Sequence, residues 1–419
     1  MWKKKRNIGI SLLMMGVLMI SSVGCEKEVE ADNLMEGIRP KSVEVKEPDE
    51  WITDGYMDLA VDLFRTSATE TEDGNVLISP LSVSIALAMT ANGAAGQTGA
   101  EMQQLFGGEG SMEEINNYFY LYRFSLPSNE TNQLKVANSI WFRDDESVLK
   151  VIPDFLQTNA NYYGTQIYKS PFDERTKSDM NRWVDRETNG MVKEIVDQVE
   201  ADDVMYLINA LMFDAQWHTP YEKTAVYAGS FACADGNSRT VDMLHGEENV
   251  YLFDDEAVGF MKPYKDHQYY FLAILPRENI GIEAYVENFT GEKLRNLLKN
   301  YRMGTVQTTM PKFSCTYEKS MKKTLKELGM VAAFDPVAAD FSQMAQSGSG
   351  NLYISDILHK TYISVNELGT RAGAVTSVEM KNSSSAMAEW TVTLDRPFLY
   401  LILDRTADLP IFIGVVKEV

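Results

Sequence analysis

Apolar and polar residues follow different patterns in the first and second halves of the chain. In the first half, Ser79 supplies an N-cap before a first-turn proline, and the apolar run that follows predicts a helix to about residue 92, with Gly93 as its stop. The stretch from Thr98 to Glu101 has the form of a capping box and predicts the start of the next short helix. The first half is therefore predicted to be mostly helical.

Strand patterns become stronger toward the C-terminus. The segments 268–275, 398–403 and 411–416 are continuous apolar runs, rich in aromatic and β-branched residues, which is typical of strands buried on both faces. Helices early and strands late, without regular βαβ alternation, indicate an α+β fold. From about Trp51 to the end of the chain there is no composition break, repeat or long linker, so residues 51–419 are predicted to form one domain.

Residues 1–24 have the pattern of an export signal. A basic start at residues 3–6 is followed by an apolar run from Ile8 to Val23. The sequence from Ser22 to Cys25 resembles a bacterial lipobox, although Ser22 stands where leucine is usual. The resemblance implies a lipoprotein-type signal peptide and a lipidated Cys25; an ordinary cleaved signal peptide is the alternative. A membrane span is disfavoured because the run is short and contains glycine and serine.

Residues 25–50 are polar and rich in charge, and they predict a flexible, solvated tether between the lipid and the folded domain. The expected localisation is that of an exported, membrane-anchored bacterial lipoprotein. It would lie at the outer membrane or cell surface or face the periplasm, with release into the medium as a further alternative.

Charge and cysteine content exclude several classes of partner. The chain has 60 acidic and 39 basic residues and a formal charge of −21, so nucleic acid is not an expected partner. Apart from Cys25, the cysteines are Cys233 and Cys315, which could form one disulfide or two buried free thiols. No CxxC or Cys/His ligand spacing occurs, so neither a metal nor another cofactor is predicted.

Catalytic motifs are missing from the sequence. There is no G-x-S-x-G elbow, H-E-x-x-H pair, Walker loop or G-x-G-x-x-G turn, and the four histidines form no recognisable constellation. The chain is therefore predicted not to be an enzyme, and a lipoprotein hydrolase is disfavoured.

Several segments resemble serpins, a family of protease inhibitors, in the same order and at the same spacing. They lie at residues 75–82, 206–210 with Trp217, 310–313, 359–360 before Glu367, 395–398 and 411–414. The resemblance implies the serpin fold. In that fold, helices pack around a large mixed central β-sheet, with two further sheets and an exposed reactive-centre loop, here at about residues 367–394.

The resemblance also assigns structural roles. Four residues match the polar cluster called the shutter, where the central sheet must part: Ser79, Ser82, Asn209 and His359. Trp217 matches the aromatic residue at the breach above it, and Lys312 matches the lysine that pairs with an acidic residue at the loop base, here Glu367. Buried polar groups of this kind need partners, and they can exchange partners when strands separate.

The loop itself has the two-residue period of a strand with one buried face. From Thr370 to Met380 alternate residues are small or apolar, and the intervening set from Arg371 to Lys381 holds all the charges. The resemblance places the loop hinge at Glu367, Gly369, Thr370, Ala372, Gly373, Ala374 and Thr376. Insertion starts there, and the small residues from Gly369 to Ala374 would let it proceed. The sequence thus encodes a strand that serpins hold outside the sheet until the loop is cut.

The resemblance implies an irreversible suicide-substrate inhibitor of serine, or also cysteine, endopeptidases. The cleaved loop would insert into the central sheet and trap the acyl-enzyme. The expected partner is a target protease, bound covalently by a monomeric inhibitor. The alternative is a non-inhibitory serpin-like binding protein whose loop is only a substrate.

Two counts place the reactive bond differently. Sixteen residues beyond Glu367, as in typical inhibitory serpins, is Ser383-Ser384, whereas counting back from Pro397 reaches Ala386-Met387. A bond at Lys381-Asn382 would suit a trypsin-like protease, and one at Met380 or Met387 an elastase-like or chymotrypsin-like protease. The bond is left as a window between residues 380 and 387.

Overall fold

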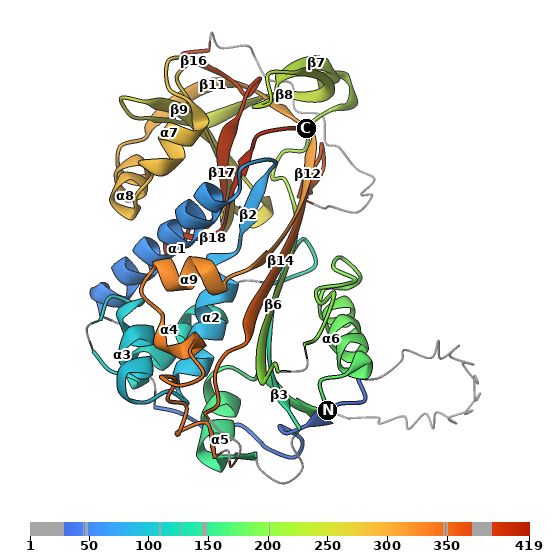
Figure 1. The fold of residues 1–419 in the computed structure, drawn as a ribbon. Coiled ribbons are helices and arrows are strands. Elements are labelled where there is room, and N and C mark those ends of the chain that lie inside the picture. The colour runs from blue at the N-terminus through green and yellow to red at the C-terminus, as the bar shows by residue number, and fades with distance from the viewer. Residues whose placement is uncertain are drawn as a thin grey trace, which may run out of the picture.

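The computed structural model describes residues 29–44, 46, 49–108, 110–126, 128–144, 149–200, 202–346, 348, 351–370 and 388–419, whose arrangement is shown in Figure 1. The helices within these residues are α1 (Glu50–Glu70), α2 (Pro80–Ala91), α3 (Gly96–Gln104), α4 (Met112–Ser125), α5 (Pro153–Tyr162), α6 (Glu174–Glu187), α7 (Ile282–Glu287), α8 (Gly291–Lys299) and α9 (Lys322–Glu327), with short 3-10 turns η1 (Lys223–Ala225), η2 (Lys265–His267) and η3 (Ala332–Phe334).

The strands belong to three sheets. They are β1 (Asp32–Asn33), β2 (Val76–Ile78), β3 (Asn132–Arg143), β4 (Lys150–Val151), β5 (Gln166–Ser170), β6 (Met205–Gln216), β7 (Val226–Ala232), β8 (Ser238–Phe253), β9 (Ala257–Pro263), β10 (Tyr269–Pro276), β11 (Arg302–Pro311), β12 (Phe313–Ser320), β13 (Ala345–Gln346), β14 (Asp356–Val365), β15 (Gly369–Thr370), β16 (Trp390–Thr393), β17 (Phe398–Asp404) and β18 (Leu409–Val416).

The large mixed sheet has the strand order β1-β5-β3-β6-β15-β14-β12, and in it β6 runs antiparallel to β3 and parallel to β14. A nine-stranded sheet has the path β16-β11-β8-β9-β10-β17-β18-β2, with β7 paired to β8, and β13 with β4 forms a third, two-stranded sheet. Helices packed around a large mixed sheet, with further sheets, confirm the predicted α+β fold.

Several predicted elements are present at their expected places. The Ser79 side chain caps α2 by accepting the N–H of Ser82, and β10, β17 and β18 occupy the three apolar runs. The predicted capping box is wrong: α3 begins at Gly96, two residues before Thr98. The Thr98 hydroxyl accepts the N–H of Asp340, and the Glu101 carboxylate accepts two N–H groups at residues 331 and 332. The Thr98 and Glu101 side chains that a local cap would need are therefore hydrogen-bonded to distant backbone groups instead.

The large sheet has a separate hydrophobic core on each face. In Figure 1, α1 and α2 lie on one side of this sheet and α6 on the other. Neighbouring residues of one strand point into different cores: Phe142 of β3 joins the core with α2, and Trp141 joins the core with Trp183 of α6. This alternation follows from the two-residue period of a strand, and it explains why the central strands are apolar on both faces.

The N-terminal segment 29–44 lies against the domain, whereas the sequence predicted a solvated tether over residues 25–50. Its strand β1 pairs with the outer edge of β5, and Leu34 donates its N–H to the carbonyl of Ile167 (2.8 Å). Val29, Ala31, Leu34 and Met35 pack against the two cores. A few spaced apolar residues are enough to cover a sheet edge, and average composition does not reveal them.

Candidate functional site at the opening of the large sheet

The two central strands β6 and β14 are paired along only part of their length. Their parallel pairing runs from Tyr206 opposite Asp356 to Ala210 opposite Lys360. In the described part of the chain, no pairing joins residues 211–214 of β6 to residues 361–364 of β14, and these two segments are called the seam below. Both strands keep their outer partners, β3 and β12. The sheet can therefore accept one more strand at the seam.

The first residues of such a strand already lie at one end of the seam. After β14 the chain turns back, and β15 enters between the two strands with Gly369 opposite Gln216 and Thr370 opposite Ala215, both antiparallel to β6. Thr370 also pairs with Val365 of β14. The Thr370 side chain is 1% exposed, so it is as buried as a core residue.

The chain beyond Thr370 leaves the described residues at 371 and returns at 388. It then forms β16, which pairs in parallel with β11 in the nine-stranded sheet. Of the predicted hinge, Glu367, Gly369 and Thr370 are therefore placed. The remaining candidates lie outside the described residues: Ala372, Gly373, Ala374, Thr376, Met380, Lys381, Asn382, Ser383, Ser384, Ala386, Met387 and Cys25.

Three consecutive carbonyls at the loop base are held by the segment that follows β6. The backbone N–H of Trp217 donates to Leu368 (2.9 Å), its indole Nε1 donates to Asn366 (2.8 Å), and the N–H of Tyr221 donates to Glu367 (2.9 Å). These bonds fix the turn through which β14 passes into β15.

An aromatic pair packs next to this turn. The Trp217 ring stacks on Tyr264 with centroids 4.5 Å apart, and both side chains are almost fully buried. The Tyr264 hydroxyl is hydrogen-bonded to the hydroxyl of Thr370. The breach tryptophan and the hinge threonine are thus linked through Tyr264, which the sequence did not single out.

A buried ion pair contacts the segment that follows β6 and holds the turn. Lys262 Nζ is 2.7 Å from Glu248 Oε1, donates to the carbonyl of Thr219 (3.1 Å), and lies 4.3 Å from the Tyr221 ring centroid. Burial raises the pKa of Glu248, and the Lys262 charge opposes that rise. Because Thr219 and Tyr221 belong to the segment that holds the loop base, the pair positions that segment.

The predicted partner of Lys312 is present. Lys312 Nζ lies 2.8 Å from Glu367 Oε2 and 3.6 Å from Asp242 Oδ2. The hydrogen bond and the charge of Lys312 lower the pKa of Glu367, and Glu367 in turn raises the pKa of Lys312. Lys312 joins β11 to β12, so the ion pair ties the loop base to the outer strand of the large sheet.

The shutter cluster lies next to the seam and consists of Ser79, Ser82, Asn138, Asn209 and His359. His359 Nδ1 is 3.0 Å from Asn209 Oδ1, and His359 Nε2 accepts the N–H of Ser79 (3.1 Å). Ser82 donates its N–H to Ser79 Oγ and its hydroxyl to Asn138 Oδ1 (3.5 Å). The cluster therefore connects α2 to the three strands β3, β6 and β14.

His359 is neutral in this arrangement. Because Nε2 accepts a hydrogen bond, the ring proton is on Nδ1 and is donated to Asn209. Burial lowers the pKa of His359 to about 3. Asn209 Nδ2 is buried and has no partner within the described residues. The Asn209 amide nitrogen, which carries two N–H donors, is thus unpaired at the position where β6 and β14 would part.

Sequence analysis found four members of the shutter cluster and missed the fifth, Asn138. Near the loop base it also missed Tyr264, Lys262 and Glu248. Asn138 and the adjacent Ser139 interrupt an otherwise apolar strand segment from Val136 to Phe142, which is a signal that could have been used. Glu248 and Lys262 are 14 residues apart on neighbouring strands, and only the pairing of β8 with β9 brings them together.

The described residues contain no group of three or more His, Cys, Asp or Glu side chains that could hold a metal ion. None of the described helices is long and apolar enough to cross a membrane. Cys233 and Cys315 are both buried and unpaired, which decides between the two alternatives left by the sequence, and burial raises the pKa of Cys315 to about 12.

Residues 54–419 match the family model described as serpin (serine protease inhibitor). The chain therefore belongs to the serpin family. Leukocyte elastase inhibitor A of Rattus norvegicus is 28% identical over 370 residues, which cover 85% of this chain and 96% of that protein.

The structure is also similar to tengpin, a thermophilic serpin solved in two states. The native state matches with a TM-score of 0.89 and 45% identity, covering 93% of this chain and 100% of tengpin. The latent state matches with a TM-score of 0.78 and 46% identity, covering 89% and 99%. The chain thus resembles the native state of tengpin more closely than its latent state.

Proposed function

We propose that this serpin is an irreversible suicide-substrate inhibitor of serine, or also cysteine, endopeptidases. The observation that carries the proposal is the short strand β15, which lies at one end of the seam and is continuous with the loop. A cut in that loop would free β15 to extend along residues 211–214 and 361–364. The named elastase inhibitor among the relatives supports the same activity.

The chemistry would belong to the protease. Its serine or cysteine attacks a loop carbonyl, the peptide bond breaks, the amine side of the loop leaves, and an acyl ester or thioester joins the loop to the enzyme. Insertion then has to be faster than hydrolysis of that bond. It is driven by the new backbone hydrogen bonds and by burial of the small alternate residues, which the intact loop forgoes.

The reactive bond is proposed to lie between Met380 and Met387, with Ser383-Ser384 as the first choice. Incubation with a panel of trypsin-, elastase- and chymotrypsin-like enzymes, and with papain-like enzymes, tests the proposal. The expected result is a complex that survives boiling in denaturant, together with a cleaved by-product whose new N-terminus identifies the bond. If every protease cuts the loop and keeps full activity, the protein is a non-inhibitory binding serpin.

We further propose that the protein is an exported bacterial lipoprotein, anchored through a lipid on Cys25 and active as a monomer. The basic start, the apolar run and the small residues before Cys25 support the anchor. Metabolic labelling with palmitate in a bacterial host should label the wild-type chain and leave Cys25→Ser unlabelled. Equal labelling of the wild type and Cys25→Ser would refute the lipid anchor on Cys25 and would leave the inhibitory proposal unaffected.

A further inference from the structure

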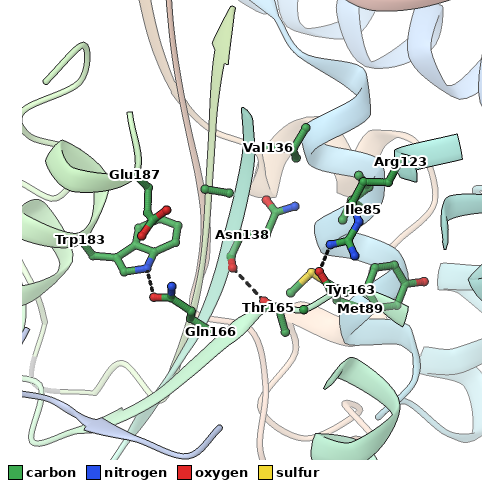
Figure 2. Close-up of a pocket in the computed structure, with 12 residues that line it drawn as sticks. Ile85, Met89, Arg123, Val136, Asn138, Tyr163, Thr165, Gln166, Trp183 and Glu187 are labelled. Atoms are coloured by element: carbon green, nitrogen blue, oxygen red, sulfur yellow. Dashed lines mark hydrogen bonds between the residues drawn. The ribbon is translucent and has the colours of Figure 1, made fainter. Parts of the chain in front are cut away.

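A small polar cavity of about 90 Å³ lies beside β3 and is lined by residues of α2, α4 and α6 and by the segment that follows α5, as Figure 2 shows. Its lining comes from helices on both sides of the sheet, with Ile85 and Met89 of α2 on one side and Trp183 and Glu187 of α6 on the other. Asn138 of the shutter cluster also lines it. The roles argued above for the seam and the loop base do not use this cavity.

Arg123 brings a positive charge to the cavity. It lies in the last turn of α4, and its guanidinium donates to the carbonyl of Tyr163, where α5 ends (Figure 2). Within the described part of the chain Arg123 has no carboxylate partner, and its guanidinium carbon also lies 5.1 Å from the centroid of the Phe124 ring. Burial lowers the pKa of Arg123. A guanidinium carries five N–H donors, and a partly buried charge without a counter-charge is unfavourable.

The exposed edge of β3 brings a second donor. The N–H of Leu134 donates to Ser128 Oγ, and the carbonyl of Asn138 accepts from Thr165 Oγ1 (2.8 Å), so both residues turn their backbone groups away from β6. By the two-residue period of a strand, Val136 between them does the same. β5 first pairs with β3 at Ser139, so no described strand covers the edge at Val136, which lines the cavity.

The other polar groups of the lining already have partners. Gln166 Oε1 accepts from Trp183 Nε1 at 2.7 Å (Figure 2). Glu187 Oε2 is 2.8 Å from Lys135 Nζ and Glu187 Oε1 is 3.0 Å from Arg186, and these two cations lower the pKa of Glu187 against the effect of its burial. The acid at the far side of the cavity is thus balanced by its own cations, and the Arg123 charge remains unmatched.

We propose that this cavity binds a small oxyanion, such as a carboxylate or sulfate, between the Arg123 guanidinium and the Val136 N–H. A planar fork of donors suits two oxygens of one anion. The volume corresponds to about three water molecules, or an anion of about four or five heavy atoms. The proposal does not rest on the proposed inhibitory function, because neither Arg123 nor Val136 belongs to the loop, the seam or the shutter cluster.

Calorimetric titration of the intact protein with sodium sulfate and with sodium acetate, at ionic strength held constant with sodium chloride, tests the site. We expect saturable binding of at least one anion with one site per chain. Arg123→Gln should weaken the affinity at least about tenfold, and Arg302→Gln should leave it unchanged. Arg302 is exposed and rests on the Phe253 ring, so its variant removes the same charge elsewhere.

Hydrogen exchange of the wild-type protein supplies a measurement that does not depend on the variants folding. A saturating concentration of the bound anion should slow amide exchange in the peptide containing Val136, relative to sodium chloride. Absence of saturable binding of both anions by the wild type would overturn the proposal. So would equal affinity in Arg123→Gln, or unchanged exchange at Val136 under saturation.

Discussion

Gly369 lies so close to Ala215 that a Cβ atom on it would be 2.0 Å from the Ala215 carbonyl oxygen. The neighbouring Gln216 Cα would be 2.9 Å away. Both contacts are with the β6 backbone, which cannot move aside as a flexible side chain could. Glycine is therefore required at the first residue of the strand that enters the seam, for reasons of space and not of backbone angle.

Gly369→Ala should push β15 away from β6. Because overpacking of a buried site destabilises by about 1–3 kcal/mol, denaturant unfolding should show a loss of stability in that range. Gly281→Ala is the matched control, since the nearest atom to its added Cβ is a glutamate side chain at 3.8 Å. If Gly369→Ala unfolds at the same denaturant concentration as the wild type, the close approach does not exist in solution.

Thr370→Glu should convert the inhibitor into a substrate. The Thr370 side chain is already buried against Tyr264 in β15, and a carboxylate there would be buried without a counter-charge. The variant should therefore keep β15 out of the seam and remove the starting point for insertion. We expect the yield of stable protease complex to fall to about a tenth or less, with cleaved protein in its place. The exposed Thr69→Glu on α1 should trap protease normally. A Thr370→Glu variant with wild-type stoichiometry would show that insertion does not start at β15.

Loss of the Lys312–Glu367 ion pair should loosen the loop base. Both side chains are about one-third exposed, so Lys312→Met and Glu367→Gln should each lower the unfolding free energy by no more than about 1 kcal/mol. The rate of spontaneous loop insertion should rise more clearly, measured as loss of protease-binding capacity during incubation below the melting temperature. Lys323→Met, which removes an exposed lysine of α9, is the control. If Lys312→Met and Glu367→Gln lose protease-binding capacity at the same rate as Lys323→Met, the ion pair does not hold the loop base.

Stability should depend on pH through His359. Its pKa is about 3 in the folded protein and about 6.5 when unfolded, so the unfolded chain binds more protons between these values. The stabilisation is therefore complete above pH 6.5 and is lost as the pH falls, by up to about 1.4 kcal/mol per pH unit.

His359→Gln isolates that contribution. Comparison of the wild type with His359→Gln in urea at pH 4 to 7 should give a shallower slope for the variant by about one proton. The variant can still donate to Asn209 and accept from Ser79, so it is expected to fold. Equal slopes would mean that His359 is not the group that titrates.

The elements that the sequence predicted well are those specified by local chemistry. The α2 cap at Ser79 and the apolar strands β10, β17 and β18 depend on neighbours along the chain. The capping box at Thr98 was mispredicted because a distant group, Asp340, takes its side chain, and the pairing of residues 32–33 with the β5 edge was not predicted. Such contacts are invisible until the strands are placed.

The same limit applies to the site. The resemblance located His359, Asn209 and Trp217 by spacing, and the structure brings the first two into contact. It gave no reason to choose Tyr264 or the Lys262–Glu248 pair. Tyr264 meets Thr370 of the large sheet, and Lys262 meets Glu248 only through the pairing of β8 with β9 in the nine-stranded sheet. The short strand β15 could be expected from the two-residue period, but its register opposite Ala215 and Gln216 could not.

The central claim is that the loop becomes a strand of the large sheet once it is cut, and the melting temperature of loop-cleaved protein tests it most directly. Insertion would add ten or so backbone hydrogen bonds at about 1 kcal/mol each, so the cleaved protein should melt at least about 10 °C above the intact protein. A cleaved protein that melts at or below the intact temperature would contradict the account.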